Sequence, residues 1–377
     1  MSRVILHTEY SSNFGGQEIR IIKESKSMRE NGYKVILAAS RGAKIIKMMK
    51  SEGFKTYEIS FKKYFFFFSF FKLKKIIEAE KVDIIHCHSS KDTWVATFTA
   101  KLLDIPIVRT RHLSLPIQPS LMTKLMYSYF VDLTITTCLE TKLSIQSVAK
   151  IDDSRCISLA SGIDPSEVTV NQADVESFKN QYNLKKSDLI LGTVCILRSW
   201  KGIETLIESA EILKNEQHIK WLIIGSGQSE HKFRKKVFEL GLEDKVIFTG
   251  FMKDPYAAIQ ALDVFLLLST KAEGISQAHL QASYLNKPSI TTDTGGLKEV
   301  CITGETGILV DKSSPQQVAD AVLVLKDVSL REKLGIAAHH LVMTRFTWNQ
   351  TIDTTKSLYE SLLSKKEALE NNLSEVN

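Results

Sequence analysis

Residues 264–282 read VFLLLSTKAEGISQAHLQA. Five consecutive apolar residues predict a buried strand at Val264–Leu268, because strands covered on both faces have continuous apolar runs. Glu273 and Gly274 follow in a loop, and Ser276 is a suitable N-cap for the helix that begins after it. A buried strand, a short loop and a helix in this order predict an α/β unit whose loop carries polar groups to the edge of a sheet.

The same unit recurs along the chain. Short β-rich runs alternate with helical patterns, and the pattern restarts after residue 185, which predicts an α/β fold with two parallel, doubly wound sheets. The other expected strands are Val4–Thr8, Lys34–Ala39, Thr56–Ile59, Val82–His86, Pro106–Thr110, Leu133–Thr137, Leu189–Cys195, Trp221–Ile224, Val246–Thr249, Ser289–Thr292 and Ile308–Val310.

The restart divides the chain into two Rossmann-like domains. We expect the first domain at residues 1–165, a polar linker at 166–187 and the second domain at 188–345. A helix is expected at 346–364, followed by a frayed polar tail at 365–377. Two such domains form a cleft between the carboxyl ends of their strands, where open α/β sheets bind ligands.

The overall composition excludes several classes of protein. Among 377 residues, 44% are apolar and 24% charged, unlike collagen, coiled coils or disordered chains. The apolar run Tyr64–Phe71 is far shorter than the roughly 20 residues of a membrane-spanning helix. The first ten residues have no signal-peptide pattern and are expected to form a strand. Five dispersed cysteines fit a reducing cytoplasm.

Basic residues are concentrated in the first part of the chain. Residues 1–160 contain 25 Lys and Arg against 15 Asp and Glu, which gives this part a net charge of +10. The whole chain has a net charge of only +6, so the remainder is acidic. Residues 61–75 contain seven Phe and five Lys, a mixture suited to the interface of an anionic bilayer. A buried helix with a lysine cap is the alternative. The predicted membrane-contact residues are Lys62, Lys63, Phe66, Phe67, Lys72, Lys74 and Lys75.

Glycines and cations follow several predicted strands. Gly15 and Gly16 precede a helix, whose N-terminal N–H groups favour anions. Arg198 and Lys201 follow the strand at 189–195 and suit a diphosphate. Another glycine turn, Gly225-Ser-Gly227, follows the next strand. The chain contains neither GxGxxG nor GxxxxGK[ST], which argues against a dinucleotide oxidoreductase or a P-loop NTPase.

Metal and hydrolase motifs are weak. His86 and His88 flank Cys87, and His112 ends the run Arg109–His112, but this set is small for a zinc site. We expect His86 and His88 to be core or loop residues. The sequence contains no Gly-x-Ser-x-Gly elbow and no Asp-x-Asp pair.

Together these segments resemble the retaining glycosyltransferases of family 4 (glycosyl transferases group 1), which have the GT-B architecture. The resemblance spans residues 3–363 and rests on the order of its motifs. These are Gly15-Gly16, Asp83–Ser89, Ile105–His112, Ser161–Asp164, Arg198–Gly202, Gly225–Gly227, Glu273-Gly274, Gly295–Val300 and Phe346–Trp348. It implies two facing Rossmann-like domains and a C-terminal helix that crosses back to the first.

The resemblance also implies roles for individual residues. Glu273 and His112 are the expected catalytic residues at the donor sugar. The expected donor-binding residues are Gly15, Gly16, Arg198, Lys201, Gly225, Gly227, Gly274, Ile275, Ser276 and Gln281. Two positions depart from the family pattern: Gln281 replaces a second glutamate, and Ile196 stands where the family has an arginine.

The expected reaction is transfer of a sugar from a UDP- or GDP-sugar to a glycolipid or lipopolysaccharide-core acceptor in cell envelope polysaccharide biosynthesis. We expect it to need no metal or cofactor, to involve no nucleic acid, and to occur in the cytoplasm at the inner face of the cytoplasmic membrane. The alternatives are a nucleotide-sugar epimerase or hydrolase of similar fold, and a non-catalytic, degenerate transferase subunit.

Overall fold

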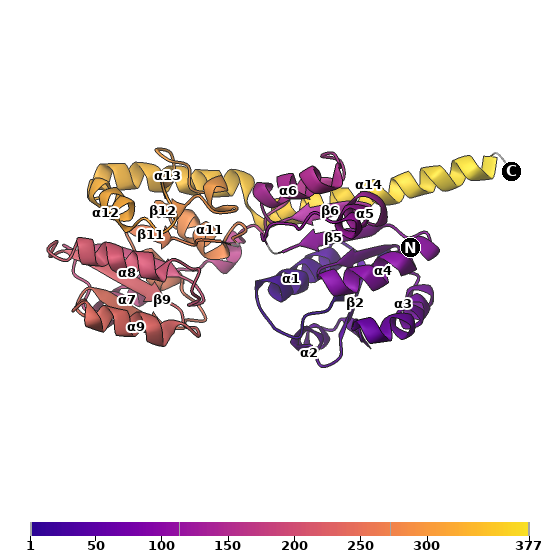
Figure 1. Ribbon diagram of the computed structural model, residues 1–377, viewed down its shortest axis with the longest axis horizontal. Coiled ribbons are helices and arrows are strands. Elements are labelled where there is room, and N and C mark those ends of the chain that lie inside the picture. The colour runs from indigo at the N-terminus through magenta and orange to yellow at the C-terminus, as the bar shows by residue number, and fades with distance from the viewer. Residues whose placement is uncertain (1, 113, 272, 376–377) are drawn as a thin grey trace. The chain divides into compact units, whose positions relative to one another are not determined.

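The computed structural model describes residues 2–112, 114–271 and 273–375. The chain divides into two compact units: Met1–Leu159 with Gln350–Asn377 (unit 1), and Ala160–Asn349 (unit 2). Each unit is a parallel sheet with helices packed on its faces, as the alternating strand and helix patterns predict (Figure 1). None of the described helices combines the length and apolarity needed to cross a bilayer.

Unit 1 contains a seven-stranded sheet in the order β3-β2-β1-β4-β5-β6-β7. The chain changes direction across the sheet between β1 and β4, which are neighbours. Its strands are β1 Val4–Glu9, β2 Lys34–Ser40, β3 Lys55–Ile59, β4 Ile84–Cys87, β5 Ile107–Arg111, β6 Leu133–Thr136 and β7 Cys156–Ser158. Its helices are α1 Gly16–Glu30, α2 Lys44–Ser51, α3 Phe66–Glu80, α4 Ser90–Leu102, α5 Leu121–Leu125, α6 Leu139–Ala149 and most of α14 Trp348–Glu375.

Unit 2 contains a six-stranded sheet in the order β10-β9-β8-β11-β12-β13, which reverses between β8 and β11. Its strands are β8 Leu189–Val194, β9 Ile219–Ile224, β10 Val246–Gly250, β11 Val264–Leu267, β12 Ser289–Thr292 and β13 Gly307–Val310. Its helices are α7 Gln172–Gln181, α8 Ile203–Ile212, α9 Glu230–Glu239, α10 Tyr256–Ala261, α11 Gln277–Tyr284, α12 Pro315–Val324 and α13 Val328–Arg345.

Three segments differ from the sequence-based expectations. Strand β7 was not predicted, because its three residues are too short a run to stand out. The expected linker at 166–187 contains α7, which buries Val175 and Phe178 in a core of unit 2. The tail expected to fray continues α14 to Glu375. There Lys366 donates to the carbonyl of Asp104, and Glu367 pairs with Arg3, so both side chains tie the helix to unit 1.

Candidate active site

The strand ends at the reversal point of unit 2 bring two predicted site residues into contact. Strands β8 and β11 are neighbours, so their following loops leave the same edge of the sheet. Lys201 Nζ, after β8, donates to Glu273 Oε1, after β11. Ser269 Oγ donates to the same oxygen at 2.6 Å. Glu273 is 6% exposed, so its charge is held by a cation and a hydroxyl inside the protein.

Backbone and hydroxyl contacts fix these loops. Thr270 N donates to the carbonyl of Trp200 at 2.8 Å, which joins the β11 loop to the β8 loop. The hydroxyls of Thr292 and Thr294 both donate to the carbonyl of Ser269. None of these hydroxyl residues was predicted from the sequence. Their signal was weak, because a Ser or Thr after a buried strand is common in any α/β protein.

The loop after Glu273 leads into α11 through a run of backbone N–H groups. Within the described chain, the amides of Gly274, Ile275 and Ser276 have no hydrogen-bond acceptor. They precede the positive end of the helix dipole, so the arrangement suits an anion next to Glu273. Gln281 is half-buried on the same helix, between its first and last turns.

The remaining predicted residues of unit 2 lie in two different settings. Arg198 is exposed, and its guanidinium carbon lies 5.1 Å from the centre of the Trp200 ring. Gly225 is required by packing, because a Cβ there would lie 1.9 Å from the carbonyl oxygen of Cys195. Gly227 is similarly close to the backbone of Leu197. Both glycines therefore seat the turn after β9 against the loop after β8.

In unit 1, the loop after β1 leads through Gly15 and Gly16 into α1. Gly15 precedes α1, and its N–H donates to Glu18 Oε2 at 2.8 Å. A Cβ built on Gly16 would have no heavy atom within 4 Å, so the start of this 15-residue helix is accessible. The positive end of a helix with open space beside it suits an anionic ligand.

His112 lies at the end of a chain of hydrogen-bonded imidazoles. Its Nε2 is 3.1 Å from His88 Nδ1, and His88 Nε2 is 2.8 Å from His7 Nδ1. Burial lowers the pKa of His7 to about 3 and holds those of His88 and His112 well below their usual value, so all three rings are neutral at neutral pH. His7 Nε2 has no hydrogen-bond partner among the described residues, and an unpaired lone pair is less costly than an unpaired N–H. The hydrogen bonds along the three imidazoles therefore place the proton of His112 on Nδ1.

A second buried network surrounds His86. Its ring nitrogens lie 2.6 Å from the Tyr359 hydroxyl and 2.7 Å from that of Thr110. The Tyr359 hydroxyl donates to Glu24, 3.1 Å away. Burial would raise the pKa of Glu24, but His86, His7 and Arg20 outweigh it and lower that pKa. His7, His86 and His88 have nitrogens within 4.8 Å of one another, yet most of these nitrogens already make hydrogen bonds. His86 and His88 are thus buried polar-core residues.

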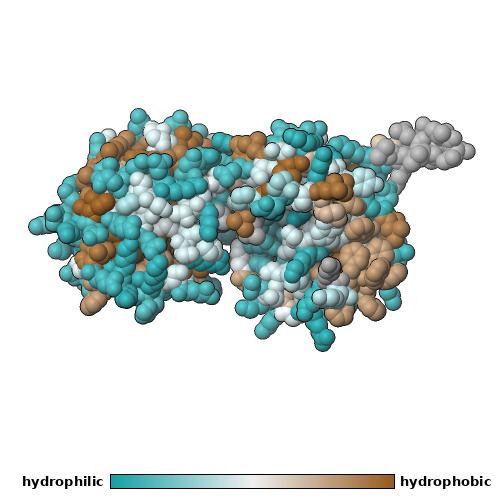
Figure 2. Space-filling model, viewed as in Figure 1, coloured by the Kyte–Doolittle hydropathy of each residue, from teal (hydrophilic) through white to brown (hydrophobic). Residues whose placement is uncertain are grey.

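The phenylalanine-rich helix α3 presents most of its aromatic side chains to solvent. Phe67 and Phe68 are 74% and 78% exposed, and Phe71 is also exposed, so a patch of apolar side chains covers this helix (Figure 2). Helix α3 buries a different face, which includes Leu73 and Ile76. The alternative of a buried helix therefore applies to only one face of α3.

Two predicted membrane-contact residues are less available than expected. Phe66 is half-buried and packs against the core of unit 1. Lys74 lies 3.7 Å from Glu78, which offsets its charge. Lys62, Lys72 and Lys75 are exposed. The side chain of Lys63 lies outside the described residues.

Comparisons with known proteins agree with this architecture. The model of Glycosyl transferases group 1 matches residues 174–340, and that of Glycosyltransferase Family 4 matches residues 14–167. N-acetyl-alpha-D-glucosaminyl L-malate synthase of Bacillus anthracis is 25% identical over 300 residues, 78% of each chain. A capsular polysaccharide biosynthesis glycosyltransferase of Staphylococcus aureus is 27% identical over 200 residues, 52% of each chain.

A solved structure supports the fold. Anabaena HepE in complex with UDP-glucose superimposes with a TM-score of 0.79 at 19% identity, covering 96% of this chain and 99% of that one. The two family models match consecutive parts of the chain, which correspond to most of unit 1 and unit 2. The chain belongs to the group 1, family 4 glycosyltransferases and has their GT-B fold.

Proposed function

We propose that this glycosyltransferase uses a UDP- or GDP-sugar as donor and retains the configuration of the transferred sugar. The pairing of Lys201 with Glu273 beside the amides of Gly274–Ser276 carries this proposal. Lys201, Arg198 and the amides bind the diphosphate, and Glu273 binds hydroxyls of the donor sugar. His112 of unit 1 offers a neutral Nδ1–H donor for a substrate hydroxyl.

The proposed reaction needs no metal, because fixed cations and amides stabilise the charge of the leaving diphosphate. The bond between the anomeric carbon and the diphosphate oxygen breaks, and the diphosphate leaves with the electron pair. The acceptor hydroxyl attacks the same face and passes its proton to the departing phosphate. Such a front-face reaction requires no pair of carboxylates flanking the sugar.

We further propose that the acceptor is a glycolipid or a lipopolysaccharide-core saccharide at the inner face of the cytoplasmic membrane. The exposed aromatic side chains of α3 and the neighbouring exposed lysines support this location. The relatives named above make different products, one of them on L-malate and one in capsule synthesis, so acceptor assays must include both small and lipid-linked acceptors.

A donor screen tests the proposed reaction. The correct nucleotide-sugar should raise the melting temperature, since it binds the folded protein. With an acceptor, it should yield a glycosylated product, and EDTA should leave the rate unchanged. Free sugar or an epimer formed without acceptor would indicate a hydrolase or epimerase. Binding without turnover would indicate a degenerate subunit, and activity restored only by Mn²⁺ would contradict the metal-free reaction.

Substitution of the two cations tests the diphosphate site. Arg198→Ala and Lys201→Ala should each raise the Kd for the nucleoside diphosphate about tenfold or more, the scale of a lost charge-assisted hydrogen bond. Isothermal titration measures the affinity. Lys326→Ala, which removes an exposed lysine elsewhere in unit 2, serves as control. An unchanged affinity in both site variants would remove these residues from the donor site.

Liposome flotation tests the membrane surface. The protein should bind anionic vesicles at low salt and should not bind neutral ones, since each lysine near an anionic surface contributes about 1 kcal/mol to the binding free energy. Replacing Lys62, Lys72 and Lys75 with Gln should abolish the charge preference. Phe67→Ser with Phe68→Ser should weaken binding even at high salt. Phe238→Ser, an equally exposed site in unit 2, is the control. Retained vesicle binding in both multiple variants would show that α3 does not contact lipid.

A further inference from the structure

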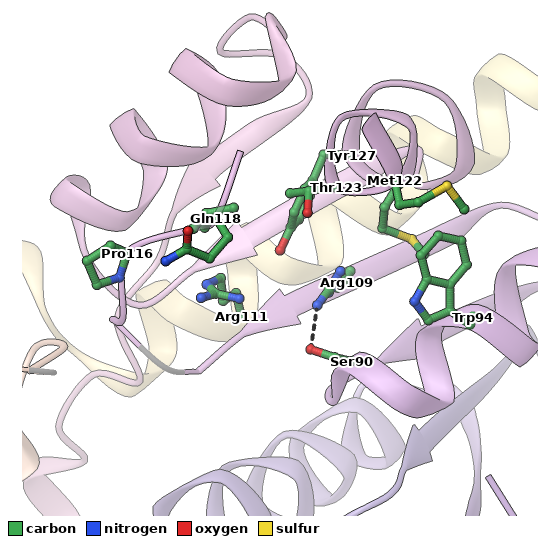
Figure 3. Close-up of a pocket in the computed structure, with 11 residues that line it drawn as sticks. Ser90, Trp94, Arg109, Arg111, Pro116, Gln118, Met122, Thr123 and Tyr127 are labelled. Carbon is green, nitrogen blue, oxygen red and sulfur yellow. Dashed lines mark hydrogen bonds between the residues drawn. The ribbon is translucent and has the colours of Figure 1, made fainter. Parts of the chain in front are cut away.

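A pocket in unit 1 concentrates positive charge without a countercharge. It has a volume of about 440 Å³, and its described lining residues include Arg109 and Arg111 but no Asp or Glu. Two residues apart on β5, the arginines lie on the same face of the sheet. Figure 3 shows both between Ser90 of α4 and the chain around Gln118 and Tyr127. We call this space the arginine pocket.

Arg109 is deeply buried for a cation that lacks a partner of opposite charge. It is 6% exposed, and the side chains of Arg109 and Arg111 donate hydrogen bonds to uncharged groups of described residues, the Ser90 hydroxyl and the Leu115 carbonyl. Arg109 donates to Ser90 Oγ at 3.1 Å and lies 4.8 Å from the Tyr127 ring centre. Asp92 interacts with it electrostatically, but burial and the neighbouring Glu9 raise the pKa of Asp92, which disfavours the charged form of that carboxyl.

Three buried polar atoms without a described partner belong to residues that line the same pocket. The Nε atoms of Arg109 and Arg111 and the hydroxyl of Tyr127 are buried and have no hydrogen-bond partner in the part of the chain that the structure describes. All three residues line the pocket. Buried polar groups are normally satisfied, and an unpaired buried cation is costly. Two planar guanidinium donors and a hydroxyl around one space match the oxygens of a phosphate group.

A second pocket adjoins the first through a shared residue. It has a volume of about 670 Å³ and also contains Trp94 in its lining. Aromatic side chains dominate this pocket: Tyr10, Phe61, Tyr64, Phe66, Trp94 and Phe98. Among its described lining residues, Lys62 and Lys91 are the charged ones. We call it the aromatic pocket; it is apolar and is flanked by the exposed patch of α3.

We propose that the two pockets form one acceptor site for a lipid phosphate. The arginine pocket binds the phosphate, and the aromatic pocket binds the first segment of the apolar chain. Trp94 forms the wall between the two and contacts the ligand at the junction of its polar and apolar parts. The lysines of the aromatic pocket add to the attraction for the anionic group. This inference rests on the proposed function, because it names the acceptor class of that transfer.

Isothermal titration with three simple probes tests the proposal: inorganic phosphate, n-octyl phosphate and n-octanol. The titrations use the full chain carrying Arg198→Ala and Lys201→Ala, which takes both cations out of the proposed diphosphate site of unit 2. Octyl phosphate should bind at least tenfold more tightly than either other probe, because it fills both pockets. Equal affinity for inorganic and octyl phosphate would indicate a soluble phosphate ligand and overturn the proposal.

Single variants assign each part of the probe to its pocket. Arg111→Gln should raise the Kd for octyl phosphate about tenfold and leave the Kd for octanol unchanged. Phe98→Ser should weaken the binding of octyl phosphate and octanol but not that of inorganic phosphate. Lys124→Gln on α5 and Leu102→Ser on α4 are matched controls, since both residues are exposed and line neither pocket. Site variants that behave like these controls would overturn the proposal.

These titrations need neither donor nor turnover. If octyl phosphate binds as expected while no nucleotide-sugar supports transfer, the proposed function fails and the lipid phosphate site stands. If transfer occurs but octyl phosphate does not bind, the acceptor belongs to another class. A circular dichroism spectrum of each variant separates loss of binding from loss of folding.

Discussion

Replacing Glu273 with Gln should lower kcat/KM for sugar transfer by about 100-fold or more, the scale of one preorganised electrostatic contact. Glutamine keeps an oxygen that accepts the hydrogen bond from the Ser269 hydroxyl, but it lacks the negative charge that pairs with Lys201. Lys201 then no longer has a fixed position, so both sugar and diphosphate contacts are affected. Steady-state kinetics with the donor identified by the screen measure this loss.

The control for this variant is Glu305→Gln, which removes an exposed carboxylate elsewhere in unit 2. It should retain normal kinetics. Thermal unfolding of both variants shows whether the loss at Glu273 comes from chemistry or from instability. Turnover within threefold of the unsubstituted protein, in a folded Glu273→Gln variant, would exclude Glu273 from the catalytic site.

The contact between Glu273 and Lys201 was partly predictable from sequence. Both residues follow buried strands, and the alternating pattern placed those strands in one parallel sheet. Their contact also requires that β8 and β11 be neighbours, which depends on the strand order and not on any local pattern. The sequence therefore indicated which edge of the sheet bears the site, and the topology determined which residues meet there.

Features assembled from distant segments had no such local signal. Glu24, His86 and Tyr359 come from α1, β4 and α14 and meet only in the folded unit. Arg109 and Arg111 were part of a recognised motif, but their missing countercharge is a three-dimensional property. For the phenylalanines of residues 61–75 the sequence did contain a local signal, but that signal could not distinguish individual side chains. Composition located the apolar surface, yet only the helix geometry separates exposed Phe67 from half-buried Phe66.

The position of Glu273 also depends on a glycine that makes no contact with any substrate in our proposal. Gly295 has a φ of +58°, and a Cβ built on it would lie 1.8 Å from the carbonyl oxygen of Glu273. The next residue, Gly296, donates its N–H to that same oxygen at 3.2 Å. An alanine at 295 must therefore push the Glu273 backbone away or abandon the turn that holds it.

Gly295→Ala should accordingly reduce kcat/KM by at least 100-fold and destabilise unit 2 by about 3 kcal/mol or more. Gly304→Ala separates backbone strain from steric conflict, because Gly304 has a φ of +80° but a Cβ placed on it would have no heavy atom within 4 Å. Left-handed backbone alone costs alanine roughly 1–2 kcal/mol, so this control should lose some stability and retain its activity. Chemical denaturation and steady-state kinetics on both variants make the comparison. If Gly295→Ala resembles Gly304→Ala in both measurements, the loop around Glu273 adapts to the methyl group, and its position is not fixed by the turn at Gly295.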